Sequence, residues 1–224
     1  MPSNARIRLF VSSRVSGLGA FAMSDDPREK AAVDLKIARA DAIHSYAGVE
    51  QSLCTLFAHL LKTGQDLAAV VFFQIIATRS RSSILETLME KRFKGEYSKY
   101  WFGVPGVAGV KKQSGLFALI QQLDTTRNFV VHWNVAVNVG DGPITESLIP
   151  PNFWDFVNDQ RSLTVAEIKA FSVKADFVSA SINMFNLFVL HEPKILETPD
   201  TWKEIFQQPC VYPPANTHPL FPKT

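Results

Sequence analysis

The sequence predicts an all-α protein, a helical bundle of four or more helices with a small β-hairpin after the third long helix. Two patterns predict this class. Apolar residues recur at steps of three and four in several long segments, most regularly between Ile168 and Val189. One short segment, residues 133–139, instead alternates apolar and small or polar residues, and the turn-forming pair Asp141-Gly142 follows it.

Composition supports a globular chain without a marked charge. The 224 residues are 46% hydrophobic, and the formal net charge is +2, so composition alone points to neither nucleic acid nor membrane. The two cysteines, Cys54 and Cys210, form no disulfide framework and no zinc-site spacing, which suits a cytoplasmic protein with reduced thiols. The longest strongly apolar run, LAAVVFFQIIA, is too short to span a bilayer, and no membrane partner is expected.

Residues 1–22 differ from the rest of the chain. They contain three arginines and several serines, no acidic residue and no helical pattern. We expect an unstructured leader or a mis-assigned start, with Met23 as the natural first residue.

The first long helix is expected from Pro27 to about Lys62. Asp26 can cap its N-terminus, Pro27 suits its first position, and Gly64 marks its end. Buried positions repeat at helical spacing along it: Val49, Leu53, Leu56, Phe57 and Leu60.

A second helix is expected from about Asp66 to Phe93. Its first half is apolar almost all round and should lie deep in the protein, and a narrow polar strip follows at Gln74, Thr78 and Arg81. The Gly- and Pro-containing stretch that leads from there to Gly115 is interpreted as a flexible connector. It does not fit the Walker phosphate-loop pattern.

The remaining elements complete the bundle, which we assign to residues 23–195. A third helix is expected from about Ser114 to His132, with Leu116, Ile120, Leu123, Arg127 and Val130 along one seam. A last long helix should begin at a capping box formed by Thr164 and Glu167. Residues 196–224 are interpreted as a Pro-rich C-terminal tail with a short helical piece near residues 202–207.

Basic residues are concentrated before the end of the third helix. Between Arg79 and Arg127 there are nine Lys or Arg and four Asp or Glu, a local balance of +5. This excess is either a solvated face or a surface that attracts polyanions. The weak candidates for RNA binding are Arg79, Arg81, Lys111 and Lys112.

The stretch LDTTRNFVVHWN, residues 123–134, places polar groups around an apolar triplet. Asn128 and His132 should lie on one face, about 40° apart around the helix, and Arg127 about 140° from His132. An arginine in an apolar seam needs an anion or a carboxylate partner. One alternative is therefore structural, with Arg127 paired to Asp124 and His132 in the core.

Other site types find no support in the sequence. No two histidines have a metal-binding spacing with a carboxylate between them, and no Gly-x-Ser-x-Gly elbow is present. His44 and His59 are interpreted as packing or surface residues. We expect no metal and no cofactor.

The hexapeptide RNFVVH resembles the Arg-x(4–6)-His signature of the HEPN superfamily, and its place at a helix end in an all-helical chain agrees with that family. The resemblance extends over residues 27–192 as architecture and over six residues as motif. It implies a bundle that commonly dimerises and, in many members, a metal-independent endoribonuclease, often a toxin or a phage-defence effector. Some members have lost catalysis and only bind.

The resemblance therefore implies roles for three residues. Arg127 would hold the scissile phosphate, His132 would transfer a proton, and Asn128 would orient one of them. The implied partners are single-stranded RNA, a second copy of the chain and an antitoxin protein, and DNA is not an expected substrate. Two alternatives stay open, a catalytically silent module that binds RNA, nucleotide or protein, and a helical interaction protein with a chance motif.

Overall fold

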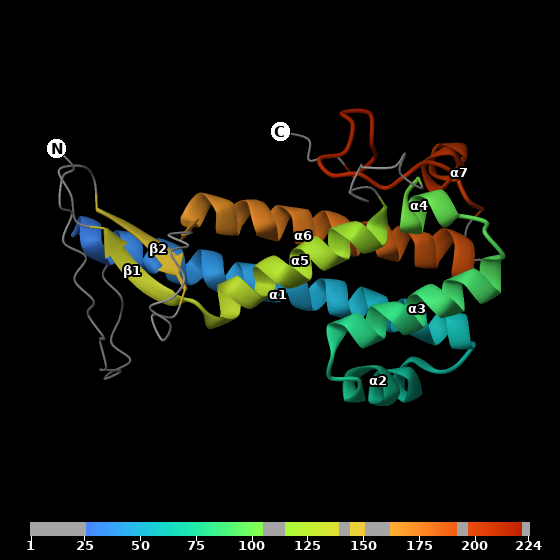
Figure 1. Ribbon diagram of the computed structural model, residues 1–224. Helices are drawn as coiled ribbons and strands as arrows, with labels where there is room; N and C mark the ends of the chain where they lie inside the picture. The colour runs from blue at the N-terminus through green and yellow to red at the C-terminus, as the bar shows by residue number, and fades with distance from the viewer. Residues whose placement is uncertain (1–25, 105–114, 139–143, 151–161, 192–196, 221–224) are drawn as a thin grey trace. The chain divides into compact units, whose positions relative to one another are not determined.

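The computed structural model describes residues 26–104, 115–138, 144–150, 162–191 and 197–220. The chain divides into two compact units, each of which collects segments that are distant in sequence. The described residues within 1–43 and 126–172 form the hairpin unit, and those within 44–125 and 173–224 form the helical unit. Figure 1 colours the elements along the chain. The all-α class with a small antiparallel sheet is confirmed.

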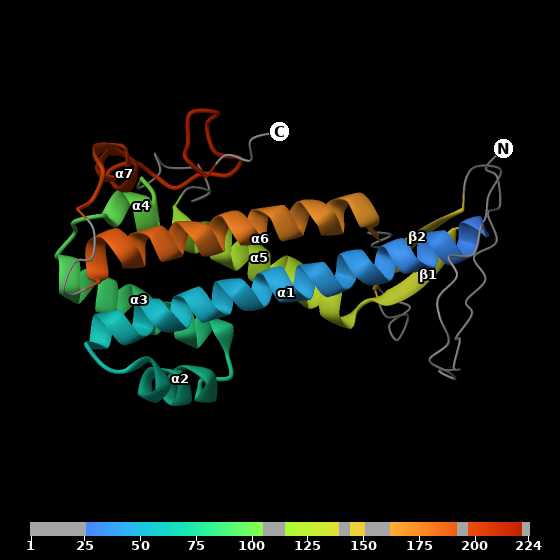
Figure 2. The same ribbon diagram turned by 180° about the vertical axis from the view of Figure 1, so that it is seen from behind.

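The hairpin unit contains the start of α1 (Pro27–Leu61), the end of α5 (Leu116–His132), the start of α6 (Val165–Phe185) and all three strands. Strands β1 (Asn134–Asn138) and β2 (Thr145–Ile149) pair antiparallel, and both ribbon views draw them as neighbours (Figures 1 and 2). The predicted hairpin is therefore confirmed, while its turn residues Asp141 and Gly142 lie outside the described residues.

The sheet differs from the expectation in one respect. A third strand, β3 (Leu163–Thr164), pairs with β2 directly before α6 begins. Two residues are too short for a periodic signal, so the sequence pattern contains no sign of this strand. Ala136 of β1 is buried, whereas Val135 is 43% exposed.

Both expected helix starts are present. Asp26 Oδ1 accepts a hydrogen bond from the Arg28 N–H at 2.9 Å and caps α1. At the start of α6, Glu167 Oε2 accepts from the Thr164 N–H at 2.8 Å, and Thr164 Oγ1 accepts from the Glu167 N–H at 3.2 Å. This is the reciprocal arrangement of a capping box, in which each side chain satisfies a backbone donor that the helix leaves unpaired.

The helical unit contains the rest of α1, α5 and α6, together with α2 (Gln65–Gln74), α3 (Thr78–Phe93), α4 (Ser98–Phe102), a π-helical turn (Asn186–Leu190) and α7 (Asp200–Phe206). Helices α4 and α7 are neighbours (Figures 1 and 2). Their aromatic side chains pack with Phe185 of α6, where the Tyr100 and Phe206 rings lie 5.1 Å apart. Cys54 and Cys210 are both buried here as free thiols.

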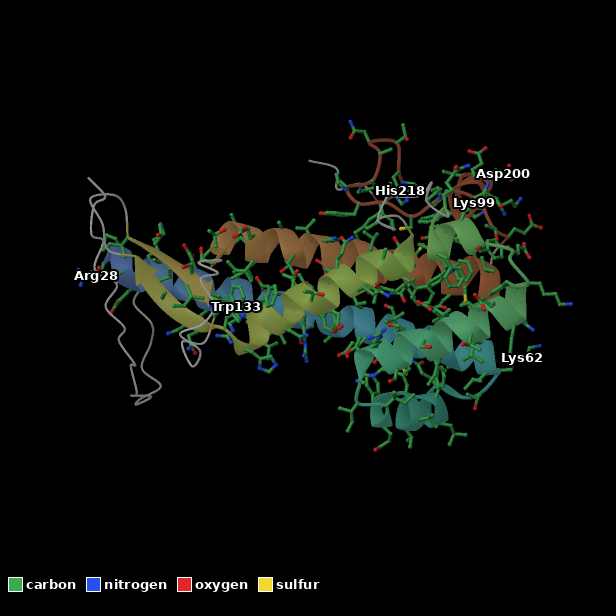
Figure 3. All side chains as sticks on the ribbon, in the orientation of Figure 1. Arg28, Lys62, Lys99, Trp133, Asp200 and His218 are labelled. Atoms are coloured by element: carbon green, nitrogen blue, oxygen red, sulfur yellow. The ribbon has the colours of Figure 1, made fainter. Side chains whose placement is uncertain are left out.

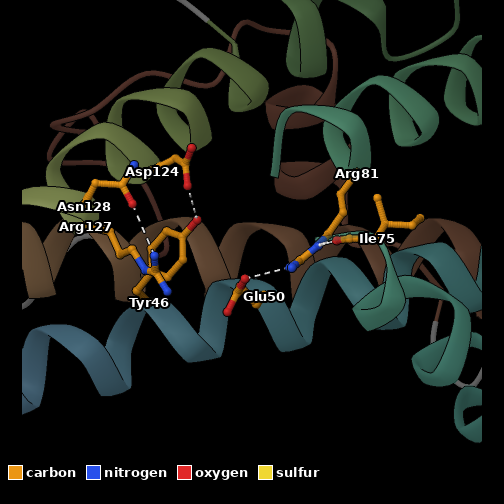
Figure 4. Close-up of polar contacts among 7 residues, drawn as sticks. All are labelled: Tyr46, Glu50, Ile75, Arg81, Asp124, Arg127 and Asn128. Carbon is orange, nitrogen blue, oxygen red and sulfur yellow. Dashed lines mark hydrogen bonds and ion pairs between the residues drawn. The ribbon is translucent and has the colours of Figure 1, made fainter. Parts of the chain in front are cut away.

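The expectation of a single second helix is wrong. Residues 75–77 separate α2 from α3, with Ile75 and Ala77 in extended conformation. Two consecutive β-branched residues, Ile75 and Ile76, weaken the helix at this point. The carbonyl of Ile75 leaves the helical pattern and accepts a hydrogen bond from Arg81 Nε at 2.6 Å, which stabilises the break (Figure 4).

Helix α2 also does not lie deep in the protein. Only Ala68 and Phe72 are buried, while Leu67 is 69% and Val70 is 65% exposed. The apolar composition of α2 therefore produces an apolar surface and not a core helix. The polar strip expected along one long helix is interrupted, because Gln74 ends α2 and Thr78 begins α3.

The connector before α5 contains a regular element that the sequence pattern missed. Tyr100 and Trp101 of α4 are almost fully buried. Gly115, which precedes α5, packs so closely on the end of α4 that a Cβ atom there would collide with the backbone of Phe102 and Gly103. Its φ of +98° also requires glycine. Residues 105–114 of the connector lie outside the described residues.

The seam of α6 is confirmed as far as Phe185, because Ile168, Phe171, Ala175, Val178, Ile182 and Phe185 are all buried. At Val189 the seam fails. The π-helical turn adds a residue to the helical period, so Phe188 and Leu190 are the buried residues there. By length and composition the segment Val165–Leu190 could cross a membrane, yet half of its most apolar window is buried inside the protein, as in a core helix.

Candidate functional site

The end of α5 is fixed by a contact from α1. Arg39 Nη2 donates a hydrogen bond to the carbonyl of Val131 at 2.6 Å. Carbonyl groups in the last turn of a helix have no partner within the helix, and a guanidinium group satisfies both the hydrogen bond and the negative end of the helix dipole. Arg39 therefore places a cation next to the backbone of His132.

Arg127 lies in the seam of α5, as the sequence predicted, and its side chain is half-buried. Its Nη1 donates a hydrogen bond to Oδ1 of the neighbouring Asn128 at 3.2 Å (Figure 4). Asn128 is exposed. The described contact of Asn128 is thus with the arginine, and it orients the guanidinium group and not the imidazole.

His132 is the last residue of α5, and its side chain is exposed. Asn128 and His132 are both exposed and one turn apart, in agreement with the single face expected from the helical period. The alternative of a core histidine at position 132 is therefore wrong. Its imidazole is therefore accessible to a bound ligand.

An aromatic pair accompanies these polar residues. The rings of Phe129 and Trp133 stack with centroids 4.5 Å apart and planes inclined by 25°. Both side chains are half-buried (Trp133 is labelled in Figure 3). Proteins that bind single-stranded nucleic acids commonly stack the unpaired bases on accessible aromatic side chains. Phe129 and Trp133 are four residues apart, the same spacing as between Asn128 and His132.

Asp124, the alternative partner for Arg127, has a contact of its own in the helical unit. Its Oδ1 accepts a hydrogen bond from Tyr46 Oη at 3.0 Å (Figure 4). Tyr46 is buried on α1. This hydrogen bond gives Asp124 a structural role that does not depend on an ion pair with Arg127.

The weak RNA-binding candidates separate into different environments. Arg79 is exposed and lines a polar cavity of about 530 Å³ with serine and threonine residues of α3. Arg81 Nη1 forms a 2.7 Å ion pair with Glu50 of α1, and only 12% of the Arg81 side chain is exposed. Its guanidinium also lies 5.3 Å from the Phe72 ring centre, so these contacts give Arg81 a structural role. Lys111 and Lys112 lie outside the described residues.

Two residues near this region have no signal in the sequence pattern. Arg39 is one of several polar residues on α1, and only its contact with Val131 distinguishes it. Glu146 on β2 is half-buried, and this burial raises the pKa of its carboxyl group, although Lys36 opposes the shift. Both depend on tertiary packing, so no spacing rule could have found them.

The arrangement in the hairpin unit can bind an anion and transfer a proton. Arg127 supplies a planar donor oriented by Asn128, and His132 supplies an accessible imidazole. Among the residues that the structure describes, no three His, Cys, Asp or Glu side chains come together as metal ligands.

Comparisons with known proteins give no relative. No family model, no curated protein and no solved structure matches this chain.

Proposed function

We propose that this protein is a metal-independent endoribonuclease of HEPN type that cuts single-stranded RNA. The observation that carries the proposal is the set Arg127, Asn128 and His132 at the end of α5, with Arg127 bonded to Asn128 and His132 exposed. The resemblance of RNFVVH to the HEPN motif supports it. A toxin or phage-defence role in the cytoplasm, with an antitoxin as partner, is the setting that this resemblance implies.

The chemistry requires only proton transfer and charge stabilisation. RNA carries its own nucleophile, the 2′-hydroxyl group, which attacks the adjacent phosphorus while the bond to the 5′-oxygen breaks. His132 takes the proton of the 2′-hydroxyl group, and Arg127 binds the phosphate oxygens whose charge grows in the transition state. The departing 5′-oxygen needs a proton as well.

One His132 per chain does not supply a separate base and acid. A homodimer related by a two-fold axis that brings two α5 ends together supplies the second imidazole. The aromatic pair Phe129–Trp133 adds stacking surface for the bases beside the cut phosphate.

A cleavage assay on varied single-stranded RNAs, in the presence of EDTA, tests the proposal. The wild type should leave a 2′,3′-cyclic phosphate and should not cut DNA. His132→Ala and Arg127→Ala should each lower the rate by on the order of 10²-fold or more. His44→Ala, which removes another exposed histidine, is the matched control and should cut at the wild-type rate.

The assay separates the alternatives. Circular dichroism must first show that both variants are folded, because Arg127 also packs in a seam. Equal cleavage by the wild type and folded His132→Ala would contradict the assigned role of His132. Absence of cleavage by the wild type would contradict the nuclease and favour the silent module.

The aromatic pair gives that second candidate its own support, because Phe129 and Trp133 can stack bases without any cleavage. A silent module should bind single-stranded RNA with a salt-dependent affinity, whereas a helical interaction protein with a chance motif should not bind it.

A further inference from the structure

A basic cavity lies within the helical unit, and none of its lining residues belongs to the proposed nuclease site. It has a volume of about 300 Å³ at the C-terminal end of α1. The residues that line it come from α1 and the turn after it, α3, and the end of the π-helical turn: Ala58, His59, Lys62, Thr63, Arg92, Leu190 and His191. Two cationic side chains, Lys62 and Arg92, and two imidazoles therefore line the same cavity.

The two imidazole rings are parallel. The ring centroids of His59 and His191 lie 5.8 Å apart, with planes inclined by 12°. Burial lowers the pKa of His59, and the charge of a protonated His191 lowers it further. His59 Nδ1 is buried without a hydrogen-bond partner at bonding distance, as is Oδ1 of Asn186, and the interaction of these two side chains raises the pKa of His59 and partly offsets the lowering. A negative charge beside the two rings would favour the protonated form of His59.

The position of His191 depends on the π-helical turn. The His191 N–H donates to the carbonyl of Asn186, five residues earlier, and Asn186 Nδ2 is anchored to the carbonyl of Ser52. The added residue in this turn shifts His191 around the helix axis relative to a continued α-helix. Such turns occur frequently at functional sites.

Lys62 occupies a backbone conformation that lysine rarely adopts. Its φ is +55°, and the hydrogen bonds from Lys62 N to His59 O and from Thr63 N to Ala58 O form the Schellman motif that ends α1. Glycine is the usual residue at this position, because it has no side chain to strain there. From this position Lys62 lines the cavity (Lys62 is labelled in Figure 3).

Charge decides which ligand class suits the cavity. A metal ion would have two histidines but also two adjacent cations, and no third His, Cys, Asp or Glu joins them among the described residues. Cations at helix ends commonly offset the helix dipole, which accounts for Lys62 and Arg92 separately. The helix dipole does not explain why both cations lie at the same cavity as the two stacked histidines.

We propose that this cavity binds the phosphate group of a small phosphomonoester, with Lys62 and Arg92 as counter-charges and His59 and His191 as hydrogen-bond donors. Two cations match a phosphate dianion, and a guanidinium group can bind two of its oxygens. The volume lies at the lower end for small-molecule pockets and leaves space for an organic group beside the phosphate. The inference does not depend on the proposed nuclease activity.

The strained position of Lys62 provides a matched pair of variants. Lys62→Gly removes the ammonium group and relieves the backbone, so the protein should melt at the same or a higher temperature while phosphate binding weakens by on the order of tenfold or more. Lys94→Gly is the control, because Lys94 also has a positive φ, of 50°, at the end of α3 but does not line this cavity. It should melt at the same or a higher temperature without any change in binding.

Calorimetric titration and the ring-proton NMR signals of the histidines give the readout. Inorganic phosphate, glycerol phosphate and adenosine monophosphate are titrated separately into wild type and both variants near neutral pH. Tighter binding of either ester than of inorganic phosphate, with shifts at His59 and His191, supports the phosphomonoester. Inorganic phosphate binding as tightly as the esters would identify a site for the free ion instead.

Two results would overturn the proposal. One is the absence of binding by the wild type at millimolar concentrations of all three probes. The other is an equal loss of binding in Lys62→Gly and Lys94→Gly, which would show a general effect of charge. The titration is repeated on His132→Ala, where unchanged binding shows that the cavity and the nuclease site are independent of each other.

Discussion

Arg81 and Arg79 lie two residues apart on α3, and their environments differ completely. Arg81 joins Glu50 and the freed carbonyl of Ile75, whereas Arg79 is exposed (Figure 4 shows Arg81). Their sequence context is the same, a basic segment before α5. The spacing predicted a polar strip at Arg81, but the partner on α1 that gives the side chain its role could not be found from spacing.

We expect Arg81→Ala to lower the free energy of unfolding by about 2–4 kcal/mol, because it leaves Glu50 with a poorly solvated charge and the Ile75 carbonyl without its donor. Arg79→Ala should change stability by less than about 0.5 kcal/mol. Urea unfolding followed by circular dichroism measures both. If Arg79 contributes to RNA binding, only Arg79→Ala should weaken that binding without loss of stability. Equal stability of the two variants would contradict the structural role of Arg81.

Glu146 provides a test by pH. Its carboxyl pKa is raised in the folded state by burial, so the folded protein disfavours the ionised form. Below the ordinary glutamate pKa of about 4.3 the group is protonated in both states and has no cost. As the pH rises through that value and then through the folded-state pKa, the destabilisation develops and persists at neutral pH.

Glu146→Gln should therefore raise the melting temperature at neutral pH and lose this advantage under acidic conditions. Thermal melts at several pH values measure the difference, with Glu90→Gln as the exposed control. A constant difference between wild type and Glu146→Gln at every pH would show that the carboxyl charge is not the cause.

At the scale of elements, the long helices were predictable because their patterns repeat. The α1 and α5 ranges agree with the expected ranges to within two residues, and the capping box of α6 forms as expected. Apart from the two-residue strand β3, the missed features are local departures from a period. They are the extended residues between α2 and α3, the five-residue α4 and the π-helical turn. Arg81 stabilises the first of them through the Ile75 carbonyl, six residues away, and is itself held by Glu50 of α1, which is distant in sequence.

The surface of α2 leads to a prediction about that element. Because Leu67 and Val70 of α2 and Ile76, which follows α2, are between 65% and 90% exposed, replacing all three by glutamine should change the melting temperature little. The replacement should also lower the fluorescence of a hydrophobic dye bound to the native protein. Phe72→Ala, at a buried position of the same helix, is the contrasting variant and should cost about 3–5 kcal/mol. A large loss in the triple variant would show that α2 is buried in solution.

At the scale of the molecule, the proposed chemistry requires two chains. The chain mass is 25.0 kDa, and light scattering at micromolar concentration should give twice that mass. The candidate site was partly predictable, because helical geometry alone placed Asn128 and His132 on one exposed face. Arg39 was not, because its contact with Val131 joins residues 92 positions apart. A monomer mass across the concentration range would remove the second imidazole from the mechanism.

The two buried thiols allow the rates of local and global unfolding to be measured by their reaction with a thiol reagent. Cys54 is fully buried in α1 and Cys210 is 5% exposed in the C-terminal segment, and burial raises the pKa of both, that of Cys210 to about 12. A thiol reagent should find almost no reactive thiolate in the native state. Labelling should proceed in two phases, one thiol per chain as the C-terminal segment detaches and the second only on global unfolding. Mass spectrometry of the partly labelled protein would then give the rate at which the C-terminal segment detaches and the rate of global unfolding, and no substitution is needed.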